Sequence, residues 1–145
     1  MRRTLLVLIL AALALTGCGG PRTAGASPSP LPTGPLVLYA RSGGLAGVDE
    51  RLTVQPDGTY QVTRRGSAPR TGRLDAAELS ELRRVLDQSH FADIPAVNPG
   101  HVDDGFSYHV VYAGHEVLAQ DGGVPDTLRT VLAELDGLYQ RLTSG

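Results

Sequence analysis

The side chains best suited to metal binding or acid–base chemistry gather between residues 101 and 115. His101, Asp103 and Asp104 lie close together, and His109 and His115 follow downstream. A metal site would use His101 and Asp103 as ligands, but their spacing matches neither the His-Glu-x-x-His pattern nor a calcium-binding loop. We therefore expect a solvated acidic loop here, with neither a metal nor another cofactor.

A nucleophilic catalyst has no better support in the sequence. Ser107 and His109 share one face of a predicted strand, yet no serine stands in the sharp turn that exposes a nucleophile. The glycine-rich segment 42–47 lacks the Lys-Ser/Thr ending of a phosphate-binding loop. Since no catalytic set converges, we expect that the chain is not an enzyme.

A different kind of site is suggested by the segment Gly43-Gly44-Leu45-Ala46-Gly47, where one large apolar side chain stands among very small ones. The interpretation that we favour is that Leu45 folds back onto the core, as apolar loop residues often do. The alternative is that Leu45 is an exposed anchor for a partner's pocket, the kind of residue that dominates an interface. If this alternative holds, residues 43–47 form a partner-binding loop.

Regular hydrophobic patterns predict the elements that hold these segments. Strands are expected at 36–41, 51–55, 59–63, 70–74, 106–112 and 115–120, several with polar and apolar residues in alternation. A helix from Ala76 to about Ser89 starts with a capping box of Asp75 and Glu78. A last helix begins at Pro125 and carries one apolar stripe up to Leu142. The simplest packing is an α+β domain, an antiparallel sheet with both helices on one face.

Composition limits the functions that this chain could have. Its 145 residues suggest one domain, and its single cysteine excludes an internal disulfide. The 13 basic residues are all arginine, against 15 acidic ones, and they form no strong basic cluster in the sequence. We therefore expect no nucleic-acid binding.

The single cysteine ends an export signal. Arg2 and Arg3 precede an apolar run at 5–15, which is too short to span about 30 Å of hydrocarbon. The motif Leu15-Thr16-Gly17-Cys18 then resembles the lipobox of bacterial lipoproteins. The resemblance implies a signal peptide at 1–17 and a diacylglyceryl anchor on Cys18. Two acyl chains on one residue anchor durably, so we expect localisation at the cell membrane, on its extracytoplasmic face.

Between the predicted anchor and the predicted domain lies a segment that cannot fold by itself. Residues 18–34 are rich in glycine, proline and serine and contain almost no large apolar side chain. We interpret them as a disordered tether, which leaves residues 35–145 for the folded domain.

Three motifs of that domain resemble a known family. They are Arg41-Ser42 followed by the segment 43–47, then Phe91-Ala92-Asp93-Ile94-Pro95 after the first helix, and Asp121-Gly122-Gly123-Val124-Pro125 before the last one. In this order they resemble the emfourin-like inhibitors of thermolysin-type (M4) metalloproteases. The resemblance covers about residues 36–142.

The resemblance implies an α+β domain that binds a metalloprotease and blocks its cleft. Such proteases favour a large apolar residue just after the cut, and Leu45 stands where it would fill that pocket. Two other classes remain open. One is a surface binding module that has kept the fold without inhibitory activity, and the other is a small envelope enzyme. The lipobox and the tether distinguish this chain from the inhibitors of the family.

Overall fold

Seven strands form one sheet in the computed structural model, which describes residues 34–144. The strand order is β4-β3-β2-β1-β6-β7-β5, and every pair is antiparallel except β5 with β7. The strands are β1 Val37–Gly43, β2 Val48–Val54, β3 Thr59–Arg64, β4 Arg70–Arg73, β5 Val97–Asn98, β6 Phe106–Tyr112 and β7 His115–Gln120. The predicted signal peptide, Cys18 and the predicted tether up to residue 33 lie outside the described residues.

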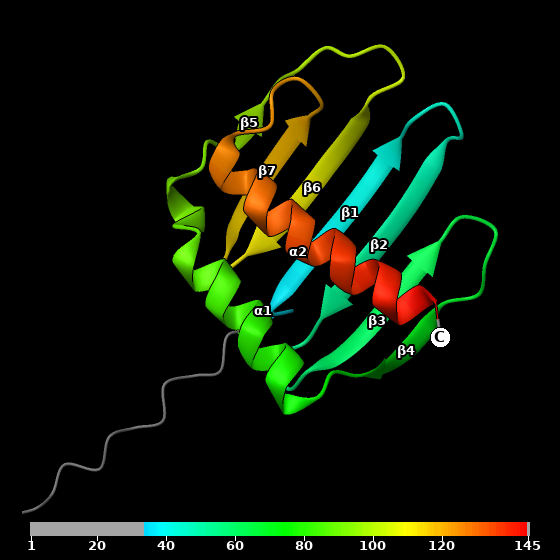
Figure 1. Ribbon diagram of the computed structural model, residues 1–145, viewed down its shortest axis with the longest axis vertical. Coiled ribbons are helices and arrows are strands. Elements are labelled where there is room, and N and C mark those ends of the chain that lie inside the picture. Colours follow the sequence, from blue (N-terminus) through cyan, green and yellow to red (C-terminus); the bar gives the residue numbers. More distant parts are fainter. Residues whose placement is uncertain (1–33, 145) are drawn as a thin grey trace, which may run out of the picture. The chain divides into compact units, whose positions relative to one another are not determined.

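Both long helices cover the same face of the sheet (Figure 1). Helix α1, Ala76–Gln88, begins with the predicted capping box, in which the side chain of Asp75 accepts from the Glu78 N–H and the carboxylate of Glu78 accepts from the Asp75 N–H. Helix α2, Asp126–Thr143, crosses the sheet diagonally. The predicted α+β class with two helices on one face is confirmed.

The core lies between this sheet face and the two helices. Alternate strand residues point inward, so that Val37, Tyr39, Leu52, Val54, Val62, Val110 and Val117 are buried with almost no exposure. The predicted stripe of α2 packs on them, and its residues from Leu128 to Tyr139 are buried. Residues Leu31–Gly145 form a compact unit. All buried apolar residues of the described part belong to this unit, so the unit contains the whole of that core.

The connection between α1 and β6 holds the main departure from the sequence prediction. Its first part is a short 3₁₀ helix η1, Phe91–Asp93, and both Phe91 and Ile94 are buried as predicted. The region predicted as a loop from Asn98 onward starts instead with β5, which pairs in parallel with β7. The buried Asn98 amide donates to the Pro95 carbonyl at 2.6 Å and holds this strand in place.

The two ends of the sheet carry different segments. Strand β1 begins at Val37 at one end and reaches Gly43 at the other, where the β1–β2 turn, the segment 99–105 and the β3–β4 turn all lie (Figure 1). Seven residues of strand at about 3.3 Å each separate these two ends. Within residues 34–144, neither helix has the length and apolar character needed to cross a membrane.

Candidate functional site

The segment 43–47 forms a tight turn at the end of the β1–β2 hairpin. Gly43 is the last residue of β1, and the turn closes with a hydrogen bond of 2.9 Å from the Gly47 N–H to the Gly44 carbonyl. The φ angles of Gly43, Gly44 and Gly47 are 106°, 69° and 60°. Side chains disfavour these left-handed angles, so the three glycines are what allows the turn.

Leu45 points away from the core. Its exposed fraction is 89%, the highest among the large apolar side chains in the described part of the chain. The expectation that Leu45 folds back is therefore wrong. The physical reason is the hydrogen bond from Gly47 to Gly44, because so short a closed turn leaves no backbone to bring the side chain back over the sheet.

The turn is braced by the start of β6. The Gly44 N–H donates to the Gly105 carbonyl at 3.1 Å, and a Cβ on Gly44 would lie only 2.7 Å from the ring of Phe106. A Cβ on Gly43 would lie 2.6 Å from the Gly105 carbonyl oxygen. Glycine at both positions thus lets the backbone of the turn lie directly against β6, and the turn presents Leu45 from a fixed support.

A charged group beneath the turn ties it to helix α2. The guanidinium of Arg41 lies 2.6 Å from a carboxylate oxygen of Glu50 and 2.8 Å from one of Asp136, with its centre 5.1 Å from the centroid of the Phe106 ring. The contact with Asp136 is a close ion pair without a hydrogen bond. Burial opposes the charge of Arg41, but the hydrogen bond to Glu50 and the charge of Asp136 hold its pKa above the ordinary value.

Asp121 stabilises the start of β6, against which the turn packs. Its carboxylate accepts from the Phe106 N–H at 2.8 Å and from the Tyr108 hydroxyl at 3.0 Å. Burial, followed by this hydrogen bond to the carboxylate, raises the pKa of Tyr108 to about 12. The motif 41–47 and the motif 121–125, which are far apart in sequence, therefore meet at Phe106. The third motif, 91–95, packs elsewhere, with Phe91 edge-on against Tyr112.

The residues considered for metal binding do not converge. His101 Nε2 and Asp103 Oδ1 are 3.7 Å apart, and both side chains are almost fully exposed. His109 pairs with Glu116 at 2.7 Å on the sheet face opposite the helices, while His115 Nε2 lies 2.8 Å from the Ile94 carbonyl. Among residues 34–144 no three His, Cys, Asp or Glu side chains group as metal ligands would.

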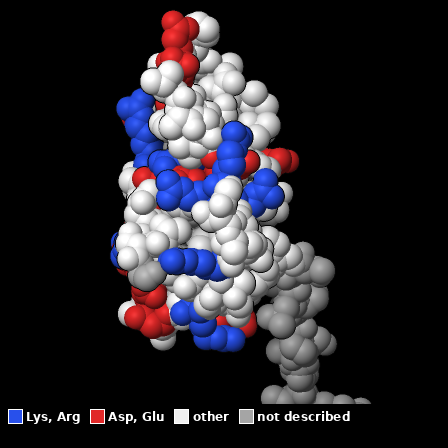
Figure 2. Space-filling view, turned by 90° about the vertical axis from the view of Figure 1, so that its right-hand side faces the viewer, with Lys and Arg blue, Asp and Glu red and all other residues white. Residues whose placement is uncertain are grey.

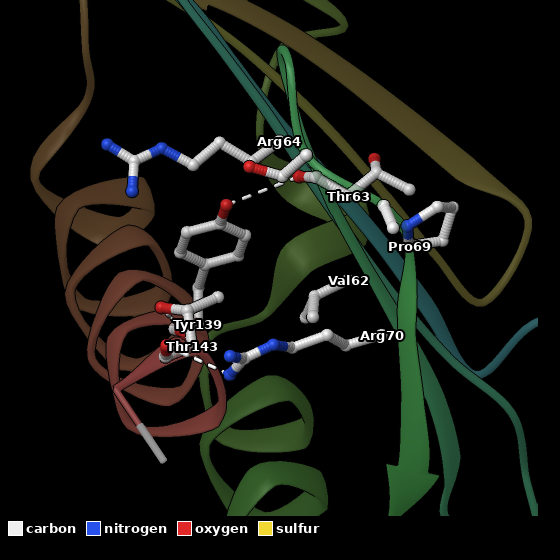
Figure 3. Close-up of a pocket in the computed structure, with 9 residues that line it drawn as sticks. Val62, Thr63, Arg64, Pro69, Arg70, Tyr139 and Thr143 are labelled. Atoms are coloured by element: carbon white, nitrogen blue, oxygen red, sulfur yellow. Dashed lines mark hydrogen bonds between the residues drawn. The ribbon is translucent and has the colours of Figure 1, made fainter.

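A pocket that the sequence did not suggest lies near the same end of the sheet (Figure 3). It has a volume of about 390 Å³ and lies between β3, the β3–β4 turn and the last turns of α2. Its walls include Val62, Pro69 and the ring of Tyr139, with Arg64 and Arg70 at its border. These residues come from segments far apart in the chain, so no local pattern marks them.

Comparison with known proteins adds no relative. The sequence matches no protein-family model, and a search of curated proteins likewise found no match. The geometry of the turn and its surroundings therefore carries the functional argument.

Proposed function

We propose that this chain is a lipoprotein anchored through Cys18 on the extracytoplasmic face of the cell membrane, and that its domain binds and inhibits a thermolysin-like metalloprotease through the loop 43–47. The observation that carries the proposal is Leu45, exposed at 89% on a turn that is braced from below. In this proposal Leu45 fills the protease pocket that receives the side chain after the cut.

Rigidity makes such a turn a better inhibitor than a flexible loop. Ordering a loop on binding costs free energy, and a loop already held in its bound form avoids that cost. The turn is already held in one conformation before binding, by the hydrogen bond from Gly44 to Gly105 and by the close approach of Gly44 to Phe106. The absence of a Cβ at Gly43, Gly44 and Gly47 also keeps the turn narrow enough to enter a cleft.

The same turn explains how the loop would resist cleavage. With Leu45 in the pocket, the bond at risk is that between Gly44 and Leu45. A zinc peptidase polarises the carbonyl of the bond that it cuts. The Gly44 carbonyl already accepts the Gly47 N–H, and its residue has a φ of 69° in place of an extended backbone. The turn would have to open before the bond could be aligned for attack.

The position of the loop suits an anchored protein. Strand β1 runs from Val37, near the start of the described residues, to Gly43, so the loop lies at the sheet end away from the chain's entry into the domain. A tether over residues 18–34 would add a reach of roughly 20 Å as a coil. Both features support the proposal, because they would let a partner outside the membrane reach Leu45.

The test mixes a fragment of residues 31–145, the unit that carries the core, with several thermolysin-like proteases. Inhibition at micromolar excess, with the fragment intact by mass spectrometry after long incubation, is the expected result. Cleavage of the fragment at the Gly44–Leu45 bond would show that it is a substrate of the protease and not an inhibitor. Binding without inhibition would favour the surface binding module, and the absence of both against every protease would sink the proposal.

A further inference from the structure

A second exposed apolar side chain lies on a loop that is joined to the turn of Leu45. In the described part of the chain, the large apolar side chains with high exposure are Leu45, Val97, Val102 and Leu118. Val97 and Leu118 are register partners on β5 and β7. Val102 belongs instead to the segment 99–105, and 52% of its surface is exposed. This segment lies at the same sheet end as the turn of Leu45 (Figure 1).

Hydrogen bonds hold the two loops side by side. At the end of the β1–β6 ladder, the Gly44 N–H donates to the Gly105 carbonyl at 3.1 Å. The Gly105 N–H in turn donates to the Val102 carbonyl at 3.0 Å and closes a turn over residues 102–105. Gly105 is therefore bonded to both loops, to one through its carbonyl and to the other through its N–H.

These bonds limit the distance between the two apolar residues. Consecutive Cα atoms are about 3.8 Å apart, residues paired in an antiparallel ladder are about 5.5 Å apart, and the ends of a turn lie within about 7 Å. The Cα atoms of Leu45 and Val102 are therefore at most about 16 Å apart. An extended peptide advances about 3.3 Å per residue, so a groove that holds about five residues would reach both side chains.

Val102 has a fixed support, as Leu45 has. A Cβ on Gly122 would lie 3.2 Å from the Val102 Cγ2 atom, so the valine packs directly on this glycine. A Cβ on Gly100 would lie only 2.2 Å from the Asp121 carbonyl oxygen. Glycine thus lets the loop lie against the backbone of the β7–α2 connection. A side chain held in this way loses little conformational freedom when a partner binds it.

The surroundings of the two loops suit an apolar contact with a polar rim. Asp103 and Asp104 follow Val102 in the chain, and both are exposed. Figure 2 shows largely uncharged surface above a band of arginines, with acidic side chains at the top of the molecule. Apolar centres with polar, solvent-accessible rims are usual in protein–protein interfaces.

We propose that Val102 is a second contact residue of the inhibitory surface, and that it enters another apolar pocket of the protease that receives Leu45. This second contact rests on the proposed function, because its partner is the same enzyme. A standard interface covers about 800 Å² on each protein, which is a disc with a radius of about 16 Å. A protein centred on Leu45 would therefore cover Val102 as well.

The test measures inhibition by variants of the fragment of residues 31–145, with a protease that the unmodified fragment inhibits. Val102→Ala removes two methyl groups, about half of whose surface is free to be buried by a partner. The inhibition constant should therefore rise about threefold to fourfold. Val102→Ile keeps the apolar contact and should stay within about twofold of the parent, whereas Val102→Asp should weaken inhibition at least about tenfold.

Val97→Ala is the matched control, because it removes the same atoms from a valine that is 65% exposed. Through Leu118 and His109, Val97 is level with Ala40 on the sheet. Three strand spacings and four residues of β1 put it roughly 20 Å from Gly44, outside the expected interface. This variant should leave the inhibition constant unchanged.

Two measurements separate binding from a structural role. The urea midpoint of Val102→Ala should equal that of the parent, since a loop loosened by the loss of packing on Gly122 would lower it. Hydrogen exchange of the unmodified fragment needs no variant. In the complex, the amides of residues 101–105 should exchange more slowly, together with those of residues 43–47, while the amides of β5 should not change.

The outcomes distinguish the second contact from the proposed function. If Leu45→Ala weakens inhibition while Val102→Ala and Val102→Asp do not, the turn acts alone, and only the second contact is refuted. Equal losses in Val97→Ala and Val102→Ala, or a loss that follows a lowered urea midpoint, would also refute it. If no thermolysin-like protease is inhibited by the unmodified fragment, the proposed function fails and the second contact fails with it.

Discussion

Truncation of Leu45 to alanine separates a binding role from a structural one. With 89% of its surface exposed, Leu45 contributes almost nothing to the core, so the free energy of unfolding should change by less than about 0.5 kcal/mol. The same exposure leaves nearly the full transfer free energy of a leucine, roughly 1.5–3 kcal/mol, available to a partner's pocket. Loss of about 2 kcal/mol corresponds to about a 30-fold weaker inhibition constant.

The assay measures both quantities on the same protein. Urea unfolding gives the stability, and steady-state inhibition of whichever thermolysin-like protease responds gives the inhibition constant. Leu118→Ala is the matched control, because Leu118 is 44% exposed on β7, distant in sequence from the turn, and loses the same atoms. It should leave the inhibition constant unchanged. Leu45→Asp should abolish inhibition, since it would bring a charge into an apolar pocket.

Two results would refute this reasoning. If Leu45→Ala lowers the unfolding free energy by more than about 1 kcal/mol, the side chain supports the fold and its exposure was misjudged. If the inhibition constant of a responsive protease changes less than threefold, Leu45 does not fill a pocket. The second outcome would indicate that the protease contacts another part of the same sheet end.

Three further predictions concern the anchor, the charged group and pH. Cys18→Ala should release the protein from membranes to the soluble fraction, and continued retention after carbonate washing would contradict the predicted anchor. Arg41→Met should lower the free energy of unfolding, measured in urea, by about 3 kcal/mol because it leaves the buried carboxylate of Glu50 unpaired. Adding Glu50→Gln to this variant should recover part of that loss. An Arg41→Met variant as stable as the parent would argue against a stabilising role of the ion pair. Burial, followed by hydrogen bonds to carboxylates, raises the pKa of Tyr108 and Tyr112 to about 12. Unfolded tyrosine titrates near 10, so the native state holds protons that the unfolded state loses, and stability should fall as pH rises from about 10 to 12. A urea midpoint that stays constant over that range would count against it.

Local chemistry was enough to predict most of the elements. The turn at Pro56-Asp57-Gly58, the capping box of Asp75 and Glu78, and the stripe of α2 all depend on residues within a few positions of one another. Each could therefore be predicted from spacing. Strand β5 could not, because its two residues carry no pattern of their own and are ordered by pairing with β7 and by the amide of Asn98.

The candidate site was predictable only in part. Spacing drew attention to the segment 43–47, but the direction of Leu45 was predicted wrongly. That direction follows from the closed turn and from Phe106 beneath Gly44, and Phe106 lies 62 positions farther along the chain. The pocket between β3 and α2 was missed for the same reason. Val62 on β3 and Tyr139 on α2 line that pocket together only because α2 packs on the sheet.

The sequence by itself determined the class of the fold and predicted an anchor at Cys18, because hydrophobic periodicity, caps and signal motifs act over short stretches of chain. The tertiary structure decided which side chains face outward and which charges remain unpaired. Exposure and pairing depend on what packs against a residue from elsewhere in the chain. For this protein those long-range contacts bring the braced turn of Leu45 and the pocket to the same end of a single sheet.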